Sequence, residues 1–264
     1  MGAVPDTSCS LRRLDGDGNR FLLVDHLGGD SVGDPVEHTR RVCADGASDV
    51  DGVLHLDRDE GGRLAMALYN RDGSRPETCG NGLRCLAWHA VDVGYEECGS
   101  FEISTDAGLT CAQVQRTSEG ELEVRVSLGP IRIIEPVPLE GPVPEATWVD
   151  CGNPHLVLFG DGLAVEEWGP RLSRDSRFPS GINVEFVQMG PASLLTRVWE
   201  RGVGETAACG SGACAVARVA VEHGLASWPV RVELPGGVLT ISPCEGGDGL
   251  WLQGSVHAVV DGPL

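Results

Sequence analysis

The feature that most constrains the fold of this chain is a motif that occurs twice. The sequence reads TCGNGLRCLA around Cys79 and ACGSGACAVA around Cys209, 130 residues later (209 − 79 = 130). Four further pairs of segments recur in the same order, at offsets of 128 to 134 residues. They are Gly18-Asn19 with Gly152-Asn153, 50–56 with 182–187, 101–110 with 230–240, and 121–126 with 249–254. Five ordered pairs indicate a duplicated domain.

Each half contains short alternating strands and one helix-compatible stretch that opens at Cys-Gly-x-Gly. This pattern predicts an α+β fold of two similar domains related by pseudo-twofold symmetry, with an active-site cleft between them. We expect an N-terminal domain at residues 1–131, which carries Cys79, and a C-terminal domain at 132–264, which carries Cys209. The Pro-rich segment from Pro130 to Pro144 is interpreted as the linker.

The net charge of −19 excludes whole classes of partner. The chain has no basic run, so it is expected to bind neither nucleic acid nor an anionic membrane. It also has no apolar run long enough for a membrane span or a signal peptide, and we expect a cytoplasmic protein.

The residues available for catalysis narrow the chemistry further. All 20 basic residues are Arg, and without Lys a pyridoxal phosphate cofactor has no partner for its Schiff base. The ten cysteines show no Cys-x2-Cys metal spacing, so no metal and no cofactor is expected. Most of these thiols are predicted to be reduced and buried, among them Cys85 and Cys214 inside the two helices.

Cys79 and Cys209 are predicted to be reactive. Each precedes a Gly at a helix start, where bare backbone N–H groups can bind a carboxylate and where a thiolate is favoured. Two such thiols on opposite faces of one bound acid could invert the carbon next to its carboxylate. One sulfur would remove the hydrogen, and the other would return it.

Four segments closely resemble the signatures of the diaminopimelate epimerase family: NRDGSRPETCGNGLRC, CGNPH, FPSGINVEF and WERGVGETAACGSGACAVA. The resemblance implies a pyridoxal-independent epimerase that converts LL- to meso-diaminopimelate, for lysine and peptidoglycan synthesis, and a possible homodimer. Cys79 and Cys209 would be its acid and base, assisted by His155 and Glu200. Substrate binding is implied for Asn19, Asn70, Gly80, Asn81, Asn153, Asn183, Glu200, Arg201, Gly210 and Ser211.

Within that binding set, the resemblance places Gly80, Asn81, Gly210 and Ser211 at the reacting carboxylate, through their backbone N–H groups. It places Asn19 and Glu200 near the substrate ammonium. Asn70, Asn153, Asn183 and Arg201 would hold the distal amino-acid end. Arg suits bidentate carboxylate binding, and Asn can both donate and accept.

The chain departs from the family pattern at Arg20, where the family usually has Asp, at Thr78, and over residues 47–52. Two alternatives therefore stay open. One is a racemase of another amino acid on the same scaffold, for example histidine or an amino acid of a specialised pathway. The other is a ligand-binding or redox-sensing protein that uses Cys79 and Cys209 as a disulfide switch.

Overall fold

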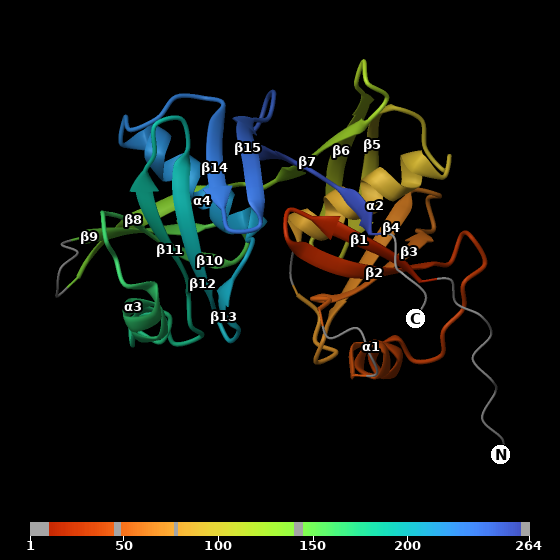
Figure 1. Ribbon diagram of the computed structural model, residues 1–264, viewed down its shortest axis with the longest axis horizontal. Coiled ribbons are helices and arrows are strands. Elements are labelled where there is room, and N and C mark those ends of the chain that lie inside the picture. Colours follow the sequence, from red (N-terminus) through yellow and green to blue (C-terminus); the bar gives the residue numbers. More distant parts are fainter. Residues whose placement is uncertain (1–10, 45–48, 77–78, 140–144, 260–264) are drawn as a thin grey trace. The chain divides into compact units, whose positions relative to one another are not determined.

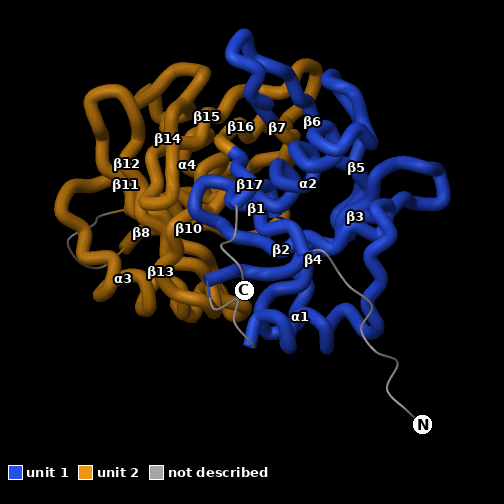
Figure 2. The backbone as a smooth tube through the Cα atoms, turned by 45° about the vertical axis from the view of Figure 1, so that its right-hand side comes forward, with its two compact units in different colours: residues 1–124, 256–264 blue, residues 125–255 orange. Residues whose placement is uncertain are grey.

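The computed structural model describes residues 11–44, 49–76, 79–139 and 145–259. The chain forms two compact units (Figure 2). Unit 1 comprises residues 1–124 and 256–264, and unit 2 comprises residues 125–255. The boundaries of the two units differ from those of the predicted domains, 1–131 and 132–264. The predicted domains follow the sequence repeat, and their bounds stay a prediction.

Unit 1 is a mixed sheet with a helix on each face (Figure 1). Strand β1 is antiparallel to β2, β2 is parallel to β3, β3 is antiparallel to β4, β4 is parallel to β5, and β5 is antiparallel to β6. Helix α1 packs on the face of Val53, and α2 on the face of Leu54. The elements are β1 (Arg12–Gly16), β2 (Asn19–Asp25), α1 (Pro35–Ala44), β3 (Gly52–Arg58), β4 (Leu64–Asn70), α2 (Gly80–Asp92), β5 (Gly99–Thr105), β6 (Gly108–Arg116) and β17 (His257–Val259), with β7 (Leu122–Leu128) crossing into unit 2.

Unit 2 repeats the same order of elements. Strands β9 to β12 and β14 to β15 pair with the same alternation of antiparallel and parallel neighbours as β1 to β6. The elements are β8 (Arg132–Pro138), β9 (Glu145–Asp150), β10 (Pro154–Phe159), α3 (Val165–Leu172), β11 (Asn183–Met189), β12 (Leu194–Glu200), β13 (Gly204–Thr206), α4 (Gly210–Glu222), β14 (Val230–Leu234), β15 (Gly237–Pro243) and β16 (Leu250–Gly254). The predicted α+β fold of two similar halves is confirmed.

The Pro-rich segment is a strand rather than a linker over its described part. Strand β8 runs from Arg132 to Pro138 and pairs with β9, and residues 140–144 lie outside the described part of the chain. Strand β17 makes the corresponding antiparallel pair with β1 in unit 1.

Helices α4 and α2 are both buried against their sheets, α4 through small or apolar side chains and α2 also through Asn81, Arg84 and His89. Helix α4 contacts β10, β11, β14 and β15 with Ala, Val and Cys side chains, most of which are fully buried. Cys85 and Cys214 are completely buried in their helices, as predicted. Such close packing fixes the N-terminus of each helix against its sheet.

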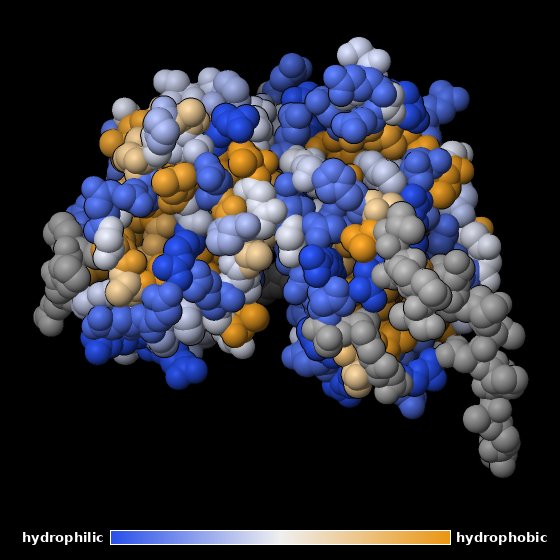
Figure 3. All heavy atoms as spheres, viewed as in Figure 1, coloured by the Kyte–Doolittle hydropathy of each residue, from blue (hydrophilic) through white to orange (hydrophobic). Residues whose placement is uncertain are grey.

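The surface of each unit is mixed in polarity. On the face shown in Figure 3, hydrophilic side chains cover much of both units, and hydrophobic side chains show in separate patches. Among the described residues, no helix combines the length and the apolar composition that a membrane span requires.

Candidate active site

Cys79 caps the N-terminus of α2 in unit 1. Its backbone is extended (φ −141°, ψ 95°), and its Sγ accepts a hydrogen bond from the Gly82 backbone N–H at 3.3 Å. The first N–H groups of a helix have no intrahelical carbonyl to bond, so those of Gly80 and Asn81 remain available for an anion. The half-buried sulfur thus lies beside a carboxylate-binding helix end.

A chain of side-chain hydrogen bonds supports this helix end. The Asn81 Nδ2 donates to Asn19 Oδ1 at 2.7 Å, and the Asn19 Nδ2 donates to Asp51 Oδ2 at 3.0 Å. Arg84, fully buried, donates to both Asn81 Oδ1 and Asp17 Oδ2 at 2.7 Å. Arg can only donate and an ionised Asp can only accept, so the two ends of the chain fix the orientation of both amides.

Cys209 caps the N-terminus of α4 in unit 2 with the same geometry. Its φ and ψ are −140° and 107°, its Sγ accepts from the Gly212 N–H at 3.4 Å, and it lies 3.6 Å from the Ser211 Oγ. Burial raises the pKa of the Cys209 thiol well above its usual range, and the charges of Glu200 and Glu185 raise it further. The hydrogen bonds from Ser211 and Gly212 oppose this shift, but they are outweighed. The pKa of Cys209 therefore favours the protonated thiol.

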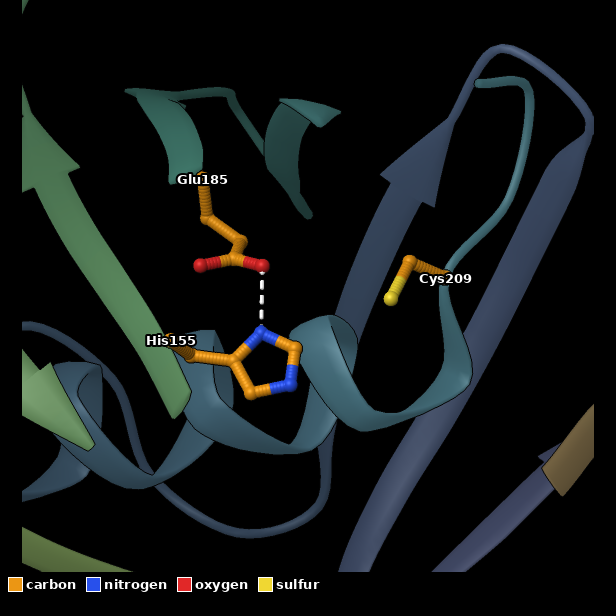
Figure 4. A group of neighbouring side chains, drawn as sticks. All are labelled: His155, Glu185 and Cys209. Atoms are coloured by element: carbon orange, nitrogen blue, oxygen red, sulfur yellow. Dashed lines mark hydrogen bonds and ion pairs between the residues drawn. The ribbon is translucent and has the colours of Figure 1, made fainter. Parts of the chain in front are cut away.

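Next to Cys209 lies a buried pair of side chains, His155 and Glu185. The Nδ1 of His155 and the Oε1 of Glu185 are 2.6 Å apart, and both side chains have no exposed surface (Figure 4). The ligand atoms of His155, Glu185 and Cys209 all lie within 4.8 Å of one another. His155 was predicted as a site residue, whereas Glu185 was not. Its signal in the sequence is a single carboxylate inside the apolar stretch INVEFV.

Glu200 and Arg201 lie at the end of β12. The Oε1 of Glu200 accepts a hydrogen bond from the Thr206 hydroxyl, and the backbone N–H of Arg201 donates to Asn183 Oδ1 at 2.9 Å. The Arg201 guanidinium donates to the Ser180 carbonyl at 3.3 Å. It lines a pocket of about 680 Å³ formed by the segments 173–181 and 199–204.

The structure places the predicted site residues in two groups, one in each unit. Unit 1 brings Asn19, Asn81 and Cys79 to the start of α2, whereas Asn70 bonds through its Nδ2 to the Ser74 Oγ at 3.0 Å. The other predicted residues lie in unit 2, and they are Asn153, His155, Asn183, Glu200, Arg201, Cys209, Gly210 and Ser211. The predicted cleft concerns both units together and stays a prediction.

Of the positions that depart from the family pattern, Arg20 and Asp51 are exposed in unit 1, whereas Val50 is completely buried. The guanidinium of Arg20 bonds to the carboxylates of Asp15 and Asp49, both at 3.1 Å. Asp51 is exposed and binds Asn19, while Thr78 and residues 47 and 48 lie outside the described part of the chain. Arg20 is thus engaged by neighbouring acids rather than directed at Cys79.

In each unit, a thiol caps a helix whose first backbone N–H groups can bind a carboxylate. This combination of fold and site places the chain among the isomerases, in the class of racemases and epimerases.

Comparison with known proteins agrees. A sequence model of the family described as diaminopimelate epimerase matches residues 14–134 and 147–259. The diaminopimelate epimerase of Desulforudis audaxviator is 37% identical over 95% of this chain and 97% of that protein. That of Methanothrix thermoacetophila is 38% identical over 95% of this chain and 94% of that protein. The chain belongs to the diaminopimelate epimerase family.

Among solved structures, the fold is similar to that of a Bacillus anthracis phenazine biosynthesis protein of the PhzF family. The TM-score is 0.70, with 95% of this chain and 96% of that chain covered. The sequence identity is 14%, so this likeness concerns the fold alone.

Proposed function

We propose that this chain interconverts LL- and meso-diaminopimelate, without pyridoxal, by a two-base mechanism in which Cys79 and Cys209 are the acid and the base. The observation that carries the proposal is the repeated cap: each sulfur accepts from the N–H of the Gly three residues later, at the first turn of a helix. The family membership supplies the substrate.

The chemistry needs no redox partner and no group transfer. One thiolate takes the α-hydrogen of the substrate as a proton, and the electron pair of the broken C–H bond stays on the substrate. The other thiol then gives its proton to the opposite face of that carbon, and it becomes the thiolate. The raised pKa of Cys209 favours its thiol form. Starting from this form, Cys209 would donate the proton to the carbon, and Cys79 would remove the α-hydrogen.

The two helix N-termini would lower the barrier of this step. Negative charge develops on the substrate carboxylate as the α-hydrogen leaves, and backbone N–H groups at a helix start are already oriented toward such charge. We assign this role to Gly80 and Asn81 in unit 1 and to Gly210 and Ser211 in unit 2.

Arg201, Asn183, Asn153 and Asn70 would bind the distal amino-acid end. A second carboxylate and a second ammonium need several donors and acceptors, and a planar guanidinium binds a carboxylate through two hydrogen bonds. We place Asn19 and Glu200 near the reacting ammonium, because the Glu200 carboxylate is a negative charge close enough to Cys209 to raise the pKa of its thiol.

The decisive experiment is α-hydrogen exchange followed by NMR in D2O, with a reductant present and no added cofactor. LL-diaminopimelate would be offered beside histidine and a panel of other L-amino acids. We expect exchange with inversion on diaminopimelate. Exchange only on another amino acid would identify a different racemase, and exchange on none would favour the binding or redox-switch alternative.

The matched variants are Cys79→Ala and Cys209→Ala, with Cys43→Ala as a control because that buried thiol lies in helix α1. Loss of a general acid or base should lower turnover at least about 10²–10⁴-fold. Full activity of either catalytic variant would refute the two-thiol mechanism.

A cytoplasmic homodimer is also part of the proposal. Acid–base catalysis by thiols requires that they stay reduced, which the cytoplasm ensures. Light scattering coupled to size-exclusion chromatography would measure the mass, and a mass of one chain would exclude the dimer.

A further inference from the structure

Glu185 is a carboxylate at a completely buried position of the sheet. It lies on the central strand β11, opposite Val157 of β10 and Val198 of β12, and it has no exposed surface. Placing a carboxylate inside a sheet is costly unless a partner compensates it.

The repeat supplies the comparison. Unit 1 pairs Leu23 with Leu54, as unit 2 pairs Val157 with Glu185. A methyl group added at Gly82 would meet the Leu54 side chain at 3.0 Å, and one added at Gly212 would meet Glu185 at 2.7 Å. Leu54 and Glu185 therefore occupy the same place, beneath the helix that each cysteine caps.

The neighbouring position differs in the same way. Phe21 lies opposite Gly52 in unit 1, and His155 lies opposite Asn183 in unit 2. Unit 1 thus builds the same architecture from Phe21 and Leu54 that unit 2 builds from His155 and Glu185. Since the apolar pair suffices for the fold, the polar pair calls for a functional explanation.

The protons of this pair follow from its burial. An ionised Glu185 beside a neutral His155 would leave a net negative charge with no exposed surface, and the Oε2 of Glu185 has no hydrogen-bond partner among the described residues. A pair that shares one further proton between Oε1 and Nδ1 is neutral as a whole. Whichever of these atoms holds that proton, the Nε2 of His155 carries a hydrogen.

That hydrogen fixes the amide of Asn153. The Nε2 of His155 lies 2.9 Å from Asn153 Oδ1, which accepts the bond. The Nδ2 of the half-buried Asn153 is then left to donate to a ligand. A donor at this point suits a carboxylate oxygen of the substrate and not an ammonium group.

We propose that Glu185 is a positioning residue which, through His155, holds Asn153 as a hydrogen-bond donor toward a carboxylate of the substrate. The proposal rests on the proposed function, because it takes Asn153 as a residue that binds the substrate.

The test is the kinetics of Glu185→Leu, which introduces the residue found at the equivalent place in unit 1. Without Glu185, the tautomer of His155 is no longer fixed, and the side-chain amide of Asn153 can rotate. We expect KM for diaminopimelate to rise about 10- to 100-fold, as for loss of a hydrogen bond to a charged group, with kcat changed much less. Glu185→Gln should restore KM to near the wild-type value, because its amide can donate to Nδ1.

Two further variants distinguish positioning from a structural role. Thr196→Val removes another buried polar group on the adjacent strand β12, whose hydroxyl donates to the Leu194 carbonyl, and it should leave KM unchanged. Asn153→Ala should raise KM as Glu185→Leu does, and the double variant should be no worse than either. An unchanged KM in Glu185→Leu, or additive effects in the double variant, would overturn the proposal.

A second measurement needs no variant that might misfold. In wild-type protein labelled with ¹⁵N-histidine, the Nε2 of His155 should carry the hydrogen that it donates to Asn153 Oδ1. An unprotonated Nε2 would overturn the inference. If wild-type protein shows no α-hydrogen exchange on diaminopimelate, the proposed function fails, while this NMR result still decides the state of the pair.

Discussion

Replacement of Arg84 by Leu should cost this protein a large share of its stability. Arg84 and Asp17 form an ion pair of 2.7 Å whose side chains are 0% and 3% exposed. Removing one partner of a buried ion pair typically costs about 3–5 kcal/mol. At about 2–4 °C per kcal/mol for a chain of this size, the midpoint of thermal unfolding should fall by roughly 6–20 °C.

Urea unfolding at neutral pH, followed by Trp fluorescence, would measure the change in the free energy of unfolding. The control is Arg63→Leu, because the pair of Arg63 and Asp59 is solvent-exposed, with a 45% exposed Arg63 side chain, and should contribute less than about 1 kcal/mol. Arg84→Leu with Asp17→Asn removes both charges of the pair, so the double variant should lose less than the sum of the single losses. A loss below about 1 kcal/mol in Arg84→Leu would refute this account of the pair.

Three further predictions concern packing, pH and binding. Gly52→Ala should destabilise unit 1 by about 1–3 kcal/mol, because a Cβ there would lie 2.4 Å from the Tyr69 carbonyl oxygen; Gly33→Ala, with open space, is the control in thermal unfolding. Burial lowers the pKa of His55 from 6.5 to about 4, with smaller contributions from neighbouring positive charges, so the unfolded chain takes up this proton first as pH falls. The free energy of unfolding should therefore decrease by up to about 3 kcal/mol between pH 6.5 and 4, and urea titrations of His55→Leu should lack this component. Arg201→Ala should weaken binding of diaminopimelate by roughly 2–5 kcal/mol, and an unchanged KM would exclude Arg201 from the distal carboxylate.

The sequence predicts those parts of the site that local chemistry specifies. Cys-Gly-x-Gly predicts a helix start whose cysteine caps the first turn, and both Cys79 and Cys209 have that geometry. The repeat of this motif also predicts the repeated fold, because the spacing of a duplicated unit survives in the positions of its motifs.

The sequence does not predict what depends on pairing between distant segments. Arg84 lies in an apolar helix, and its partner Asp17 is 67 residues away, so nothing local marks the ion pair. In the sequence, Glu185 is one polar residue in a strand-like stretch. Its partner His155 comes beside it through the pairing of β10 with β11. The prolines of β8 indicate a linker by composition, and composition alone does not show that this segment pairs with β9.

The pairing of β17 with β1 has a consequence for the order in which the units can form during synthesis. Arg13 lies opposite Val259, so β1 cannot form its pair with β17 until residue 259 has been synthesised. Unit 2 is continuous over residues 125–255 and has all its strands earlier. The second repeat to be translated can therefore fold to completion before the first, which reverses the usual N-to-C order of domain folding.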